Sequence, residues 1–61
     1  MRPPFVKGER VVVPGRYRGL VVSECLSTRA GAWVVRAEFE SGSGRYEGPA
    51  HEFQRANAEV L

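Results

Sequence analysis

Two arginines flank an aromatic residue in the segment Arg16-Tyr17-Arg18. This is the most suggestive local cluster in the chain, because it places two positive charges directly beside an aromatic ring. Guanidinium groups neutralise phosphates, while an aromatic ring stacks on a nucleic-acid base or against a cation. Arg45-Tyr46 repeats the combination later in the chain. These five residues predict a surface that contacts nucleic acid. The alternative is that the arginines are solvated and Tyr17 covers the open end of a core.

Three other positions carry side chains with possible chemistry. Trp33 can contact a ligand, as in aromatic pockets for peptides or methylated cations, although we favour a role in covering the core or a contact between subunits. His51 and Glu52 are not expected to act as an acid/base pair, because adjacent residues of a helical turn point apart. Cys25 has apolar neighbours, which is typical of an inert core thiol.

The sequence holds no residue set for a self-contained catalytic or metal centre. One cysteine and one histidine fall short of the four ligands of a structural zinc site. It contains no Gly-rich phosphate loop and no nucleophile triad. We therefore predict that the protein is not an enzyme and has no cofactor or metal.

Length and composition indicate one small globular domain. The 61 residues are 43% hydrophobic and 26% charged, with a net charge of +2 that permits nucleic-acid binding without requiring it. Eight of the nine cations are arginine, a bias that a GC-rich genome also produces. A domain of this size buries only ~60% of its unfolded surface. Small domains are often stabilised by a disulfide, a metal or oligomerisation. Because one cysteine cannot form an intrachain disulfide and no zinc set is present, self-association is the remaining way to stabilise so small a core.

The chain is expected to be cytoplasmic, with no membrane partner. No apolar run approaches the ~20 residues that a membrane span needs. The opening Met1-Arg2-Pro3-Pro4 lacks the apolar stretch of a signal peptide. The unpaired Cys25 agrees with a reducing compartment.

Short β-branched or alternating segments, separated by glycines, predict an all-β fold. Residues 32–40 alternate most clearly, with Trp33, Val35, Ala37 and Phe39 on one face and Arg36, Glu38 and Glu40 on the other. The other expected strands are residues 11–13, 20–26, 45–48 and 54–57. Residues 16–19 are expected to form a loop, and residues 49–53 a single 3-10 turn that begins with proline.

A sheet this small is expected to curl into a barrel that covers its apolar face and limits its open edges. The expected interior residues are Val11 or Val13, Val21, Val35, Ala37, Phe39 and Phe53. We predict a disordered tail over residues 1–4, a barrel over residues 5–57 and a frayed C-terminus over residues 58–61.

The run Lys7-Gly8-Glu9-Arg10-Val11, followed by Gly19-Leu20-Val21-Val22, resembles the opening of many small bacterial SH3-like barrels. It also resembles the KOW pattern of ribosomal and transcription-elongation proteins, in which a Gly-ended loop precedes a valine strand. The resemblance implies a five-stranded SH3-like barrel with one short 3-10 turn before the last strand. Loops of such barrels often bind ligands.

The segment Phe5-Val6-Lys7-Gly8-Glu9-Arg10-Val11 is similar to the Phe-x-x-Gly-Asp-Arg-Val opening of plasmid-borne type II dihydrofolate reductases. Residues 19–57 align with that family with little or no gap, and Tyr17-Arg18-Gly19 falls where it has Trp-Gln-Gly. The family binds its substrate and cofactor with a Val-Gln-Ile-Tyr strand that lines the pore of a tetramer. Here the corresponding stretch is Arg45-Tyr46-Glu47-Gly48, so the resemblance implies the architecture and neither the reductase activity nor that tetramer.

Three hypotheses of function follow, in order of preference. The first is a non-catalytic module that contacts nucleic acid, or a partner of nucleic acid, through Arg16, Tyr17, Arg18, Arg45 and Tyr46. The second is a protein-interaction or homo-oligomerising barrel that uses Trp33 with exposed valines at positions 12, 22 and 34. The third is an enzyme of the type II reductase kind.

Overall fold

Five short strands form one antiparallel sheet in the computed structural model, which describes residues 2–56. The elements are β1 (Arg10–Val13), β2 (Tyr17–Ser27), β3 (Trp33–Phe39), β4 (Arg45–Pro49), the 3-10 turn η1 (Ala50–Glu52) and β5 (Gln54–Arg55). The predicted all-β class and the single 3-10 turn before the last strand are confirmed. The expected fraying of residues 58–61, residue 57 of the last strand and residue 1 of the tail lie outside the described residues.

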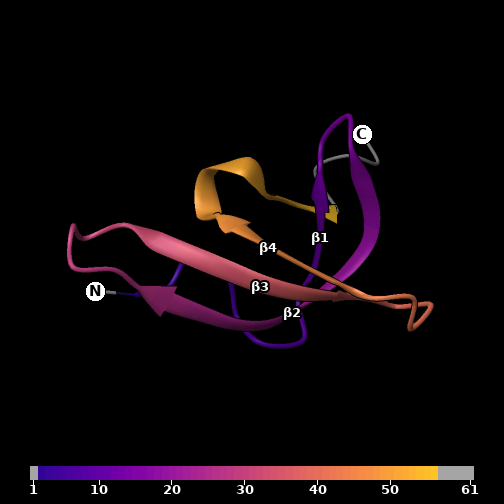
Figure 1. The fold of residues 1–61 in the computed structure, drawn as a ribbon, viewed down its shortest axis with the longest axis horizontal. Coiled ribbons are helices and arrows are strands. Elements are labelled where there is room, and N and C mark those ends of the chain that lie inside the picture. Colours follow the sequence, from indigo (N-terminus) through magenta and orange to yellow (C-terminus); the bar gives the residue numbers. More distant parts are fainter. Residues whose placement is uncertain (1, 57–61) are drawn as a thin grey trace.

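The strand order is β4-β3-β2-β1-β5, so β4 and β5 are the two edges of the sheet. Figure 1 shows η1 leading the chain from the end of β4 back to β5, which pairs with β1. Because the two edge strands do not pair with each other, the sheet is open.

β2 is the longest strand and belongs to both halves of the sheet. Its first residues pair with β1, and the stretch from Leu20 to Ser27 pairs with β3. Figure 1 shows β2 curving strongly between these two partners. The register with β3 shifts between Val22 and Glu24, and such irregularities bend a strand and increase its twist.

The prediction of a loop over residues 16–19 is wrong, because residues 17–19 belong to β2. Pro14 and Gly15 complete the turn alone: Arg16 N–H donates to the carbonyl oxygen of Val13 at 2.9 Å. Gly15 has a φ of 77°, and proline followed by such a glycine is the residue pattern of a type II turn. The second strand can therefore begin as early as Tyr17.

One cluster of buried side chains holds the strands together. Its members are Phe5, Val11, Val13, Leu20, Val22, Val35, Ala37 and Phe53. Val21 and Phe39 were expected inside but are only half-buried. Three consecutive apolar residues at positions 20–22 do not define which face is buried, since a one-residue slip exchanges the faces of a strand.

Val12 and Val22 were expected on an exposed contact patch, and this prediction is also wrong. Their relative exposure is 4% and 2%. Val34, the third valine of that patch, is half-buried. The alternation on β3 was predicted correctly, because Val35 and Ala37 are fully buried while Arg36 and Glu38 are exposed.

Candidate functional site

All three phenylalanines and both tyrosines of the chain lie in one continuous row of rings. The Tyr17 ring lies 5.8 Å from that of Phe39 and 4.9 Å from that of Tyr46, measured between centroids. Tyr46 continues the row to Phe53 at 5.7 Å, and Phe53 to Phe5 at 6.3 Å. All four distances fall within the ~4.5–7 Å range of favourable aromatic pairs. The row joins β2, β3 and β4 to the residues beside β5 and β1.

Tyr46 is held in this row by a hydrogen bond. Its hydroxyl donates to Oε1 of Glu52, in η1, at 2.7 Å. This bond, then burial of the ring and then the negative charge of Glu52 raise the pKa of Tyr46 above its ordinary value. A Cβ atom at Gly48 would lie only 3.0 Å from Glu52 Oε1 and 3.1 Å from the Tyr46 hydroxyl oxygen. The absence of a side chain at Gly48 therefore leaves room for this contact.

Arg16 lies against the two tyrosines. Its guanidinium carbon is 5.4 Å from the centroid of the Tyr17 ring and 6.0 Å from that of Tyr46. Both distances are within the ~6 Å reach of a cation–π interaction. Among residues 2–56, no carboxylate forms an ion pair with Arg16. We call Arg16, Tyr17 and Tyr46 together the Arg16 cluster.

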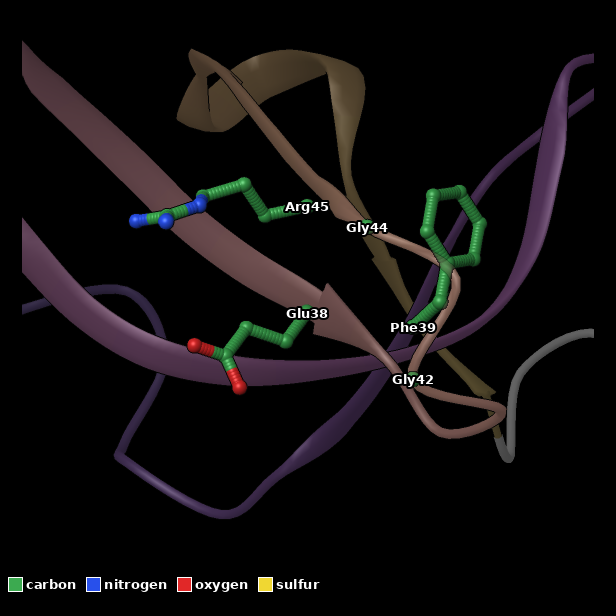
Figure 2. A pocket seen from close by; sticks show the side chains of 5 residues that line it. All are labelled: Glu38, Phe39, Gly42, Gly44 and Arg45. Atoms are coloured by element: carbon green, nitrogen blue, oxygen red, sulfur yellow. The ribbon is translucent and has the colours of Figure 1, made fainter.

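Two of the predicted nucleic-acid contacts point away from this cluster. Arg18 follows Tyr17 in β2 and Arg45 precedes Tyr46 in β4, and successive side chains of a strand point to opposite faces. Figure 2 shows the Arg45 and Glu38 side chains extending to the same side, while Phe39 points the other way. Glu38, Phe39, Gly42, Gly44 and Arg45 line a shallow hollow there. The structure thus brings together three of the five predicted residues.

Trp33, the sixth predicted site residue, is also separate from the cluster. It pairs with Ser27 at the end of β2 opposite to Tyr17. Its side chain is half-buried. Trp33 and the Arg16 cluster therefore belong to different parts of the surface.

The reasoning from sequence considered Glu52 only as a partner of His51 in an acid/base pair, and it missed the contact of Glu52 with Tyr46. Glu52 is half-buried and accepts the Tyr46 hydrogen bond, whereas its neighbour His51 is exposed. The segment Gly48-Pro49 offered a signal, because a glycine followed by a proline and a 3-10 turn folds the chain back onto the preceding strand. Cys25 is half-buried, as a packed thiol should be, and its Sγ donates to the Phe5 carbonyl oxygen at 3.3 Å.

The outer face of β2, β3 and β4 carries a different arrangement, built from charges. Arg36, in β3, donates from Nε to Glu47 at 2.8 Å and from Nη1 to Glu24 at 2.9 Å. The hydrogen bond with Glu47 is the main cause of a raised pKa at Arg36. All three side chains are about half exposed, between 47% and 53%. Because the single positive charge of Arg36 is paired with two carboxylates, this group of three side chains is poorly suited to binding phosphate.

No group of three His, Cys, Asp or Glu side chains that could hold a metal ion occurs in the described part of the chain. Residues 2–56 also contain no helix long and apolar enough to cross a membrane. The contacts of Arg16 with two tyrosine rings make the Arg16 cluster the candidate site that the geometry favours.

Comparison with known proteins adds no relative. No protein-family model matches the chain, and neither a curated protein nor a solved structure matches it. An inference of function must therefore rest on the contacts of the Arg16 cluster.

Proposed function

We propose that this protein is a non-catalytic binding module that contacts single-stranded nucleic acid through Arg16, Tyr17 and Tyr46. The observation that carries the proposal is the position of the Arg16 guanidinium against two tyrosine rings whose centroids are 4.9 Å apart. A cation beside two half-buried rings, which are tilted by 45° to each other, supplies both interactions that such ligands need, neutralisation of a phosphate and stacking on an unpaired base.

The charge distribution around the cluster supports an anionic ligand. Arg16 is exposed and makes no ion pair with the described residues, so its charge is available to a phosphate. Glu52 is the acidic residue in contact with the cluster, and one of its oxygens accepts the Tyr46 hydroxyl. Arg45 is exposed on the opposite face of its strand and adds positive potential. We expect it to raise affinity without stacking.

We also propose that the sheet is the wall of an SH3-like barrel, and that the protein works in the cytoplasm. Three features support the barrel: the bend of β2 between β1 and β3, the turn η1 between the two edge strands, and the return of β5 to β1. The free thiol of Cys25 favours a reducing compartment. In such a barrel the two tyrosine rings of the Arg16 cluster pack against the core, and the exposed Arg16 side chain lies beside them where a strand of nucleic acid can reach it.

Fluorescence anisotropy with a labelled oligothymidine of about 16 nucleotides tests the proposal, since this length spans known site sizes of small barrels. Affinity should fall steeply as salt rises, because binding releases counterions. Arg16→Ala should weaken binding and reduce the slope of log affinity against log salt by about 1. Absence of binding at low ionic strength, or an affinity that does not change with salt, contradicts the proposal.

Arg29→Ala provides the matched control. Arg29 is an exposed arginine in the turn between β2 and β3, so the substitution removes the same charge far along β2 from Tyr17. It should leave affinity within about twofold, the change that a distant surface charge causes. Equal losses for the two variants would show that net charge, and not the Arg16 cluster, determines binding.

A further inference from the structure

β4 has one open edge. It pairs with β3 on one side, and no described strand pairs with it on the other. Phe39 N–H donates to the carbonyl oxygen of Gly44 at 2.9 Å, so the backbone N–H of Phe39, and by alternation the backbone groups of Ala37 and Val35, point to β4. Hydrogen-bonded and non-hydrogen-bonded pairs alternate along an antiparallel ladder. The backbone groups of Arg45, Glu47 and Pro49 therefore point to the open edge.

Pro49 agrees with this assignment. It lies opposite Val34, at a position whose N–H would point away from β3. Proline has no N–H, and within sheets it is confined to positions where none is needed by the neighbouring strand. Arg45 and Glu47 thus offer two N–H donors and two carbonyl acceptors to a further strand.

Two neighbouring rows of outer-face side chains cross the sheet and end at this edge, and their last residues carry opposite charges. One row crosses the sheet through Glu24, Arg36 and Glu47, and it alternates in sign and ends with a negative charge. The next row crosses through Val21, Glu38 and Arg45, and it ends with a positive charge. An exposed edge with one positive and one negative side chain is complementary to a second copy of itself that is related by a two-fold rotation, because each charge then faces the opposite charge.

We propose that β4 pairs antiparallel with β4 of a second copy of this chain, with Arg45 opposite Glu47 of the second copy. The two-fold axis then passes beside Tyr46. Each Arg45–Glu47 pair exchanges two backbone hydrogen bonds, because both residues point their backbone groups to the open edge. The row Glu24, Arg36, Glu47 continues into Arg45 and Glu38 of the second copy, so its charges alternate across the whole interface.

Neighbouring registers are disfavoured by the same residues. Moving the axis to Glu47 places two carboxylates opposite each other and sets Arg45 against a proline that cannot donate. Moving it to Arg45 places two guanidinium groups opposite each other. Like charges directly opposite in a ladder are destabilising. Arg45, Glu47 and Pro49 therefore select one register.

This association goes beyond the proposed binding of nucleic acid and does not require it. It would place the two Tyr46 residues opposite each other on the core side, so that two Arg16 clusters lie next to each other. A failure to bind oligonucleotide leaves the dimer intact, and a failure to dimerise leaves a single binding surface. The two proposals can therefore fail separately.

Sedimentation equilibrium of the full chain without nucleic acid is the first test. We expect a mass that rises with concentration to twice the 6.8 kDa of one chain. Arg45→Glu and Glu47→Arg should each lower self-affinity at least tenfold, because each places like charges opposite each other. An equimolar mixture of the two variants should form a heterodimer, because the acidic edge of one then faces the basic edge of the other. Arg29→Glu, the matched charge reversal, should dimerise as the parent chain does.

Three results would overturn the proposal: a monomeric parent chain at about 1 mM, single variants that dimerise as the parent does, or a mixture that stays monomeric. Amide hydrogen exchange of the parent chain gives an answer that does not depend on how well the variants fold. Raising the protein concentration should slow exchange at Arg45 and Glu47, which face the open edge. Exchange at Tyr46 and Gly48, which face β3, should change little, and equal changes at all four amides would contradict the pairing.

Discussion

The core side and the outer face of β2, β3 and β4 use the same three strands in different ways. On the core side, Leu20, Val22, Val35 and Ala37 are at most 2% exposed, and the aromatic row packs beside them. On the outer face, Arg36, Glu24 and Glu47 form hydrogen-bonded ion pairs that stay about half exposed. Burial contributes roughly 25 cal/mol for each Å² of apolar surface, whereas exposed ion pairs contribute little.

The difference separates two tasks. The core side holds the small domain together, while the outer face determines which charges a neighbour meets. The Arg16 cluster lies where the two environments join: its tyrosine rings are half-buried against the core, and its guanidinium is exposed. A ligand can therefore be held by rings whose positions are fixed by the fold.

The largest effect is expected from Leu20→Ala. Leu20 is 0% exposed, and truncating a buried leucine costs about 2–5 kcal/mol. At about 0.05–0.15 kcal/mol per residue, that is a large part of the stability of so small a chain. The urea midpoint should fall sharply, or the variant should fail to fold.

Leu26→Ala is the matched control, because Leu26 lies in the same strand and is 39% exposed. Its unfolding free energy should change by about 0.5 kcal/mol or less. Comparable losses for the two leucines would show that stability is not concentrated on the core side.

A smaller and pH-dependent effect is expected at Tyr46. Its folded-state pKa is raised above 10.0, first by the hydrogen bond to Glu52 and then by burial. The protonated phenol therefore stabilises the folded state: the contribution is complete below the pKa of the unfolded chain and is lost as the pH rises through the folded-state pKa. Tyr17→Phe leaves Tyr46 as the only tyrosine, and its tyrosinate absorbance should have a midpoint above pH 10.

Two further substitutions in that background test the cause. Glu52→Gln should lower the midpoint, because the hydrogen bond to a carboxylate and its negative charge are removed. Arg16→Ala should raise the midpoint, because the positive charge of Arg16 lowers the pKa of Tyr46. A midpoint that does not respond to Glu52→Gln would contradict the contact between η1 and β4.

The sequence predicted the positions of most elements because their boundaries depend on local chemistry. Pro14-Gly15 ends β1, and Gly42 and Gly44 lie in the turn between β3 and β4. The alternation on β3 assigns Val35 to the core and Arg36 to solvent. The run Leu20-Val21-Val22 has no alternation, so only the register with β3 decides which residues are buried.

The grouping of the site residues depended on long-range packing. Tyr17 and Tyr46 are in contact because β2 bends and because β4 lies on the other side of β3 from β2. A local sequence pattern cannot predict such a contact. The separation of Arg18 and Arg45 from the tyrosines was predictable, because adjacent strand residues point to opposite faces. Treating the five residues as one surface overlooked this alternation.

The smallest effect on stability is expected from Arg36→Gln on the outer face. The substitution breaks both ion pairs, yet its partners are exposed and water can solvate them. The urea midpoint should move much less than for Leu20→Ala, and the difference from the parent chain should shrink further in 1 M salt, where the Debye length is about 3 Å. A loss as large as that of Leu20→Ala would show that the charged face supports the fold.

The most direct test of the central claim, that the Arg16 cluster is a binding surface, is NMR chemical-shift mapping with an oligothymidine at low salt. We predict the largest shifts at Arg16, Tyr17 and Tyr46, and little change at Glu24, Arg36 and Glu47. Shifts confined to the outer face, or no shifts at any of these residues, would contradict it.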